Sequence, residues 1–133
     1  MKRKPPLSRN GQAGVALLEV LVSVLLFSLG LLGLIGLQAR AISFSVDAED
    51  RNRAALLANE ISAQMWIYKS VNVPADVLTA WKARVSDPTT GGLPSGDGKV
   101  TPDATKPFAD VEITWQPPSR DTASKLTTRV VLP

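Results

Sequence analysis

Few residues of this 133-residue chain could do chemistry, and Glu19 is the one whose surroundings demand an explanation. The sequence has no cysteine and no histidine, which excludes thiolate or imidazole zinc sites and Cys–His or Ser–His–Asp nucleophile systems. Glu19 lies inside an apolar stretch from Val15 to Leu37 that is otherwise interrupted only by Ser23, Ser28 and three glycines. A carboxylate at such a position in a membrane costs roughly 3 kcal/mol and indicates a partner or a function.

The segment Leu93-Pro94-Ser95-Gly96-Asp97-Gly98-Lys99-Val100 is a second place where a ligand could bind. A phosphate-binding loop would end in Gly-Lys-Ser/Thr and lead into a helix, and this segment has neither property. A calcium loop would need the spaced acids of an EF-hand, whereas only Asp97 and Asp103 are available. We therefore predict a plain turn, with no metal and no cofactor.

The element that positions Glu19 is the apolar stretch itself. At ~1.5 Å per residue, a helix from Val15 to Leu37 would be about 34 Å long, enough to cross a hydrocarbon layer of about 30 Å. The sequence therefore predicts a transmembrane helix over residues 15–37.

The formal charge of +3 is confined to the start of the chain. Lys2, Arg3, Lys4 and Arg9 all precede the apolar stretch, and removing them leaves 11 cationic and 12 acidic residues, a net charge of −1. Because no clustered basic face remains, we expect no nucleic-acid partner. The same four cations would keep the N-terminus in the cytoplasm and send the rest of the chain outward.

A secretory signal peptide and a simple signal anchor are two ordinary interpretations of this N-terminus. The triplet Ala39-Arg40-Ala41 would suit signal cleavage, but the apolar stretch is longer than the core of about 7–15 residues typical of signal peptides. Neither interpretation explains Glu19.

The string Gly14-Val15-Ala16-Leu17-Leu18-Glu19 resembles the class III (type IV prepilin) processing signal. The resemblance implies that prepilin peptidase cuts between Gly14 and Val15 and removes residues 1–14 as a basic leader. It also implies N-methylation of Val15 and a role for Glu19, the fifth residue of the mature chain, in assembly and register. Val15 stands where phenylalanine or methionine is commoner, and Ala16 where serine or threonine is frequent.

This resemblance gives the spacing a physical reason. Cleavage would leave a positive amine on Val15 in an apolar environment, and Glu19 is its i,i+4 neighbour on a helix. The carboxylate can neutralise that amine in its own or an adjacent subunit, so two charges that are each costly in lipid are tolerated as a pair.

One helix is expected to continue well beyond the apolar stretch, since no proline occurs between Pro6 and Pro74. Gly30, Gly33 and Gly36 recur every three residues near one face of it. They indicate either close helix packing or a segment that melts in a filament, and the residues do not separate the two.

Residues 38–70 are predicted to form the amphipathic half of this helix. Glu49 and Arg53 lie on its polar side at i,i+4 spacing. The string Arg51-Asn52-Arg53-Ala54-Ala55-Leu56-Leu57-Ala58-Asn59-Glu60-Ile61 resembles the corresponding helix of PilV-type minor pilins. The apolar stripe that we expect in the core of a head domain consists of Ala54, Leu57, Ala58, Ile61, Met65 and Tyr68.

Residues 71–133 are predicted to form a small head. Residues 74–85 have helical spacing, and the Gly/Pro/Ser/Thr-rich residues 86–107 have a loop composition. Two period-two segments predict antiparallel strands, with a third strand near Val100. Their inward positions are Val111, Ile113 and Trp115 in one strand and Leu126, Thr128, Val130 and Leu132 in the other.

The fold class that follows is α+β of the type IV pilin-like kind, a long N-terminal helix packed against a small antiparallel sheet. The resemblance to PilV-type minor pilins implies a non-enzymatic structural subunit that helps to initiate type IV pilus assembly, with roles in adhesion and twitching motility. The implied partners are the prepilin peptidase, other minor pilins, the major pilin, in some cases a tip adhesin, and the bacterial inner membrane. The head would lie in the periplasm and later in the pilus.

Two other functions remain open. A minor pseudopilin of a type II secretion system would share the leader and Glu19. A signal-anchored periplasmic binding protein would use the loop, for example residues 89–106, as its contact surface. An anchored enzyme is disfavoured because the head offers only scattered Asp, Glu and Lys.

Overall fold

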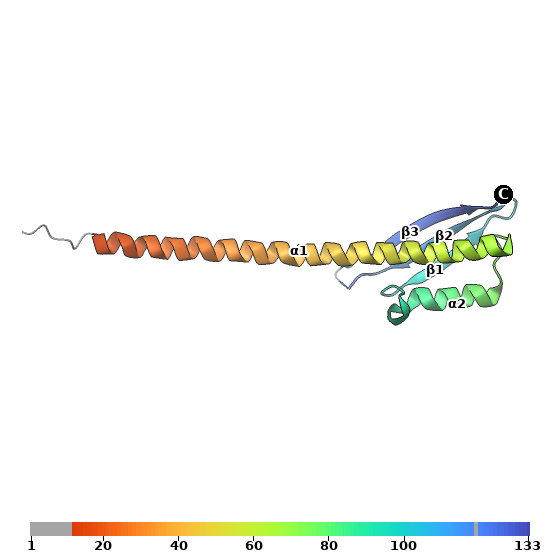
Figure 1. The fold of residues 1–133 in the computed structure, drawn as a ribbon, viewed down its shortest axis with the longest axis horizontal. Helices are drawn as coiled ribbons and strands as arrows, with labels where there is room; N and C mark the ends of the chain where they lie inside the picture. Colours follow the sequence, from red (N-terminus) through yellow and green to blue (C-terminus); the bar gives the residue numbers. More distant parts are fainter. Residues whose placement is uncertain (1–11, 119) are drawn as a thin grey trace, which may run out of the picture. The chain divides into compact units, whose positions relative to one another are not determined.

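The computed structural model describes residues 12–118 and 120–133, which contain a long N-terminal helix and a small antiparallel sheet (Figure 1). The chain divides into two compact units, Met1–Ile42 and Ser43–Pro133. The elements are α1 (Gln12–Tyr68), α2 (Ala75–Ser86), the 3₁₀ turn η2 (Pro88–Thr90), β1 (Asp97–Pro102), β2 (Phe108–Trp115) and β3 (Ser124–Val131). The predicted α+β arrangement is therefore confirmed.

In the first unit, α1 is helical throughout and every side chain from Gly14 to Ile42 is exposed. Large apolar side chains surround the helix on all sides, and Phe27, for example, is 68% exposed. A helix that is apolar all round requires an apolar environment. This helix is long and apolar enough to cross a membrane.

In the second unit, the continuation of α1 buries one stripe of side chains, as the amphipathic pattern predicts. Tyr68 was expected in this stripe, but it is 47% exposed. The reason is that α1 ends at Tyr68 and Lys69 adopts a left-handed φ of 49°, so no further helical turn encloses the ring. The buried members of the stripe are Ala54, Leu57, Ala58, Ile61 and Met65.

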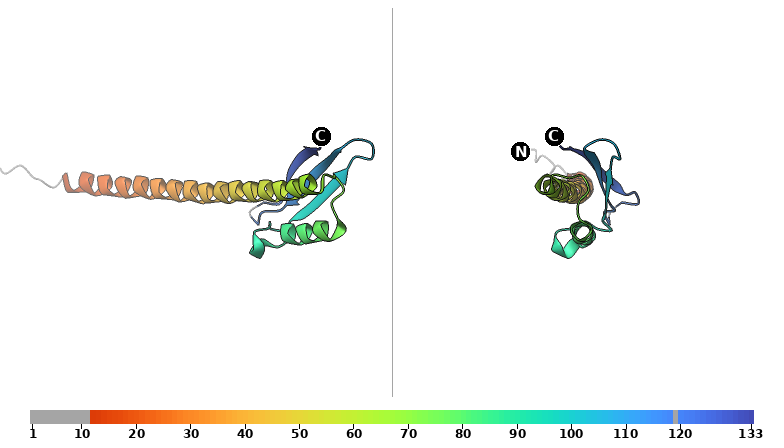
Figure 2. Two further views of the ribbon diagram at one scale, coloured as in Figure 1. Left: turned by 45° about the vertical axis from the view of Figure 1, so that its right-hand side comes forward. Right: turned by 90° about the vertical axis from the view of Figure 1, so that its right-hand side faces the viewer.

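The sheet has the order β1-β2-β3, and both pairs are antiparallel. The central strand β2 alternates strictly between half-buried and buried residues, which confirms the period-two prediction. Trp115 is 2% exposed and is therefore the core residue that the sequence indicates. Figure 2 shows α2 on the same side of the sheet as the α1 segment of this unit. The core between these layers includes Val111, Ile113, Val130 and Leu132.

The second predicted helix is observed as α2, and Trp81 is its main contact with α1. The Trp81 side chain is fully buried, and its indole Nε1–H donates a hydrogen bond of 2.8 Å to the carbonyl oxygen of Leu57. Val85 is buried one helical turn later. A buried indole N–H requires an acceptor, so this bond sets how α2 lies against α1.

The segment 86–107 has a loop composition but is a loop only in part, and the third strand predicted near Val100 is confirmed within it. The strand β1 lies within it, and Leu93 is fully buried in the core. Gly98 sits directly under Trp81, since a Cβ added to it would lie 2.6 Å from Trp81 Cη2. Pairing with β2, a tertiary contact, stabilises this strand despite its turn-like composition.

Candidate functional site

The processing motif lies in the first turns of α1. Val15 and Glu19 are one helical turn apart and both are exposed. Among residues 12–118 and 120–133, a Cβ added to Gly14 would meet nothing within 4 Å, so packing against these residues does not require glycine there. Any requirement for Gly14 would have to come from a molecule that binds this segment.

Residues 1–11 of the predicted leader lie outside the described residues. The Gly14–Val15 bond itself is within α1, which begins at Gln12. Proximity to the helix end matters because terminal turns fray readily. A peptidase could therefore reach this bond by unwinding little more than one turn.

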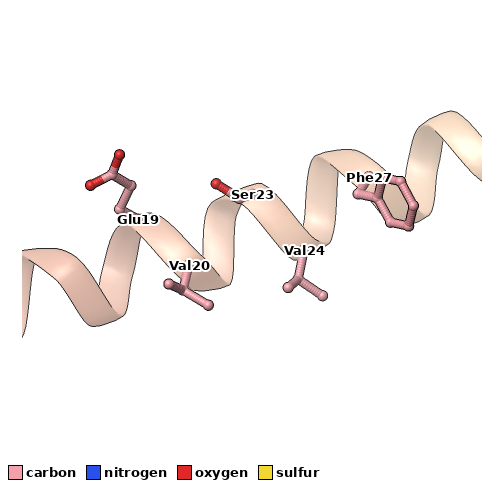
Figure 3. A pocket seen from close by; sticks show the side chains of 5 residues that line it. All are labelled: Glu19, Val20, Ser23, Val24 and Phe27. Carbon is pink, nitrogen blue, oxygen red and sulfur yellow. The ribbon is translucent and has the colours of Figure 1, made fainter.

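Glu19 is the only charged residue between Gln12 and Ala39. Its carboxylate projects from the side of the helix and forms no ion pair within residues 12–118 and 120–133 (Figure 3). It lies at one end of a shallow apolar hollow, whose other lining residues are Val20, Ser23, Val24 and Phe27. This side of the helix combines an apolar surface with one carboxylate, which suits a second helix that brings a cation.

Gly30, Gly33 and Gly36 are all α-helical. Added Cβ atoms at these positions would meet nothing within 4 Å. The glycines thus leave an open, narrow strip on the helix, and both the packing and the melting interpretations stay predictions.

The acids of the predicted turn have local structural roles. Asp103 Oδ1 accepts hydrogen bonds from the backbone N–H groups of Thr105 at 2.8 Å and of Lys106 at 2.9 Å. These bonds, with that from the Thr105 hydroxyl, hold the pKa of Asp103 below its ordinary value. Asp97 is exposed at the start of β1, opposite Thr114. The described part of the chain contains no group of three or more acids that could hold a metal.

The proposed contact loop of a binding module, residues 89–106, is exposed at most positions but also forms part of the fold. It includes β1 and the buried side chain of Leu93. Deleting it would remove one edge of the sheet and part of the core, so this deletion cannot test a binding role.

The sequence analysis did not single out Asp50, a buried acid in the α1 segment of the second unit. Asp50 is 4% exposed and its Oδ2 has no hydrogen-bond partner, and burial raises the pKa of its carboxyl group. Asp47, one turn earlier, pairs with Arg120 of the β2–β3 connection through Oδ2 but has a buried, unpartnered Oδ1. The signal was present, because Asp50 precedes Ala54 by four residues and so continues the buried stripe.

Ion pairs on the outside of the second unit follow simpler rules. The predicted Glu49–Arg53 pair is observed. Glu60 of α1 also pairs with Arg84 of α2, two residues that are 24 apart in the chain. The Glu60–Arg84 pair joins α1 to α2, and the local sequence around either residue does not predict this contact.

Comparisons with protein-family models, with curated proteins and with solved structures found no match to this chain.

Proposed function

We propose that this protein is a minor pilin of a type IV pilus, a non-enzymatic subunit that is processed by prepilin peptidase and helps to initiate pilus assembly. The observation that carries the proposal is the position of Gly14, Val15 and Glu19 in the first turns of an apolar, fully exposed helix. The four leader cations supply the remaining part of the signal.

Glu19 has the central role in this proposal. After cleavage, the new amine on Val15 carries a positive charge where the helix offers no other charged group nearby. A carboxylate and an ammonium that are both in a low-dielectric environment attract each other strongly, and a lone charge there is costly. Pairing between Glu19 of one subunit and the Val15 amine of its neighbour would set the register of the two helices.

The proposed location follows from the charge distribution. Cations before the span favour a cytoplasmic N-terminus, which leaves residues 43–133 on the periplasmic side of the inner membrane. The subunit would leave the membrane by packing its exposed apolar helix against those of the other minor pilins and the major pilin.

The first experiment is to determine the N-terminus and intact mass of the protein from membranes of its own host. A chain that begins at N-methylated Val15 is expected. An uncut chain, or one that begins at Ile42 after Ala39-Arg40-Ala41, would contradict the proposal.

Glu19→Gln tests the register role. The variant keeps the shape of the side chain but cannot neutralise an amine. We expect normal cleavage and membrane insertion, with incorporation into sheared pili reduced by about tenfold or more, because the unpaired amine stays in lipid. Ser23→Ala, one turn further along the same side of the helix, is the matched control and should assemble normally. Normal assembly of Glu19→Gln would exclude the role assigned to Glu19.

A minor pseudopilin of a type II secretion system would be processed in the same way. Deletion of the gene separates the two: loss of surface pili supports the proposal, whereas loss of secreted enzymes with normal pili contradicts it.

A further inference from the structure

The two edges of the sheet differ in how they are protected. Edge strand β1 has only six residues, ends in Pro102, and lies against α2, whose Trp81 covers Gly98. These are the usual devices that prevent a sheet edge from pairing with another chain. Edge strand β3 has eight residues and contains no proline.

The strand β3 pairs on one side only. It is the last strand of the order β1-β2-β3, and among the described residues no other strand pairs with its free edge (Figure 1). Its unpaired N–H and C=O groups form a template for one more strand.

The free edge adjoins a shallow groove between β3 and α1. One hollow lies between Ala55, Ala58 and Asn59 of α1 and Leu126, Thr127 and Thr128 of β3. A second hollow, with a volume of about 310 Å³, lies between Trp66 and Lys69 and the chain end at Leu132 and Pro133. The α1 residues that border the two hollows fall on one helical face.

The groove floor consists mainly of short side chains. Ala55, Asn59 and Ser62 follow one another at helical spacings of four and three, and Trp66 comes four residues later. Ser62 satisfies its own hydroxyl by donating to the Ala58 carbonyl oxygen at 2.6 Å. The short side chains of the floor leave room for an additional strand, whose polar groups could also serve the Asn59 amide.

The outer face of the sheet adds a charge pattern. Asp110 and Glu112 of β2 pair with Arg129 and Lys125 of β3, so a column of anions is followed by a column of cations. Both cations remain more than half exposed. Acidic side chains on a strand added beside β3 would therefore complement the cations Lys125 and Arg129.

We propose that the free edge of β3 binds an extended segment of a different subunit, which adds a fourth strand to the sheet. The segment presents apolar side chains to the α1 groove and acidic side chains to Lys125 and Arg129. A second copy of this chain is disfavoured, because antiparallel pairing of two β3 strands centred on Thr127 would place Lys125 opposite Arg129 of the other copy, and like charges in facing positions are destabilising.

A suitable probe is the synthetic peptide Phe-Ala-Asp-Val-Glu-Ile-Thr-Trp. This sequence copies β2, which already pairs with the other edge of β3 and carries apolar and acidic residues on opposite faces. The full-length protein in detergent micelles is titrated with the labelled peptide, and hydrogen exchange of backbone amides is measured in parallel. The control peptide replaces Asp and Glu by Lys.

The expected result is saturable binding of the acidic peptide with added protection of amides in β3 and none in β1. The affinity of the Lys-substituted peptide should be lower by about tenfold or more, because this peptide places cations beside Lys125 and Arg129.

Thr128→Lys tests the groove in the protein itself, since Thr128 is half-buried on the helix side of β3. An inward-pointing lysine on an edge strand opposes strand addition, so peptide affinity should fall by about tenfold or more. The control is Thr101→Lys, at an exposed position of the other edge strand, which should leave affinity within about twofold.

Protection of β1 instead of β3, equal binding of both peptides, or no saturable binding by wild-type protein would overturn the proposal. Concentration-dependent protection of β3 without peptide would also overturn it, by assigning the edge to a second copy. The proposal does not depend on prepilin processing. A chain that is cut after Gly14 but does not bind the peptide would support the pilin function and exclude the strand site. An uncut chain that binds the peptide would support the strand site and contradict the pilin function.

Discussion

Both units of this protein contain part of α1, but only the second unit buries one face of it. From Gly14 to Ile42 every side chain of α1 is exposed, and nearly all are apolar. From Ser43 onward α1 exposes polar side chains together with some large apolar ones, such as Leu56 and Ile67, and buries a stripe of alanine, leucine, isoleucine and methionine under the sheet. The first segment needs an apolar solvent, whereas the second makes its own apolar interior.

The two units are therefore stabilised by different interactions. The helix of the first unit satisfies its backbone within itself, so no single side chain is essential to its shape. The second unit depends on contacts between residues far apart in the chain, such as Trp81 with Leu57. Substitutions of the same type should therefore have very different effects in the two units.

The largest contrast is expected from removing a large side chain. Trp115→Ala should lower the free energy of unfolding of the head by about 3–5 kcal/mol, because a buried ring leaves a cavity. Phe27→Ala, in the exposed segment, should leave it unchanged. Loss of amide protection in β2 with urea, measured on full-length protein in micelles, gives both values. Equal destabilisation by the two substitutions would show that the units are not independent.

Glycine-to-alanine substitutions should change stability in opposite directions in the two units. Gly98→Ala forces a methyl group toward Trp81 and should destabilise the head by about 1–3 kcal/mol. Gly33→Ala meets open space and should favour the helix by about 1 kcal/mol. Head unfolding and helix content by circular dichroism report the two effects. A stable Gly98→Ala head would contradict the close approach of Trp81.

Asp50 allows a test through pH. Burial raises its pKa in the folded state above the unfolded value of 3.8, so the folded state holds its proton more tightly. The contribution of this group to stability is therefore greatest at low pH and falls as the pH rises through the folded pKa. Asp50→Asn should remove this dependence and stabilise the head at pH 7 by roughly 1 kcal/mol.

The control for Asp50→Asn is Asp76→Asn, at an exposed position in α2. Urea unfolding from pH 4 to pH 7 compares both variants with wild type. An unchanged pH profile for Asp50→Asn would show that this carboxyl group is not the source of the slope.

The smallest effect is expected at the surface of α1. Glu49→Gln removes the i,i+4 ion pair with Arg53 and should cost about 0.3–0.5 kcal/mol, an effect that added salt diminishes. Thermal unfolding at low and high salt measures it. A decrease of more than about 1 kcal/mol in the free energy of unfolding would contradict the assignment of this pair as an ordinary surface ion pair.

Several parts of the fold could be predicted because their patterns are local. The two helices, the alternation in β2 and the burial of Trp115 each follow from residues near one another in the chain. The prediction was wrong for Tyr68, and it placed the third strand near Val100 without giving its bounds. Tyr68 is exposed because the helix ends there, and pairing with β2 fixes the third strand at residues 97–102.

The candidate site divides in the same way. Glu19 could be singled out from the sequence alone, since a carboxylate in an apolar helix is conspicuous in any sequence, whereas Gly14 and Val15 were identified by the resemblance to the prepilin processing signal. Asp50 was overlooked because an aspartate on an amphipathic helix is usually solvated, although its position four residues before Ala54 continues the buried stripe.

By itself, the sequence determined the long helix, the apolar character of its first part and the place of one carboxylate within it, because hydrogen bonding and hydropathy along a helix are local properties. Only the tertiary structure decided which sheet edge is covered and which is open. It also decided that Gly98 must admit Trp81. These features depend on residues that approach one another across the sheet, and no local pattern in the chain encodes such distances.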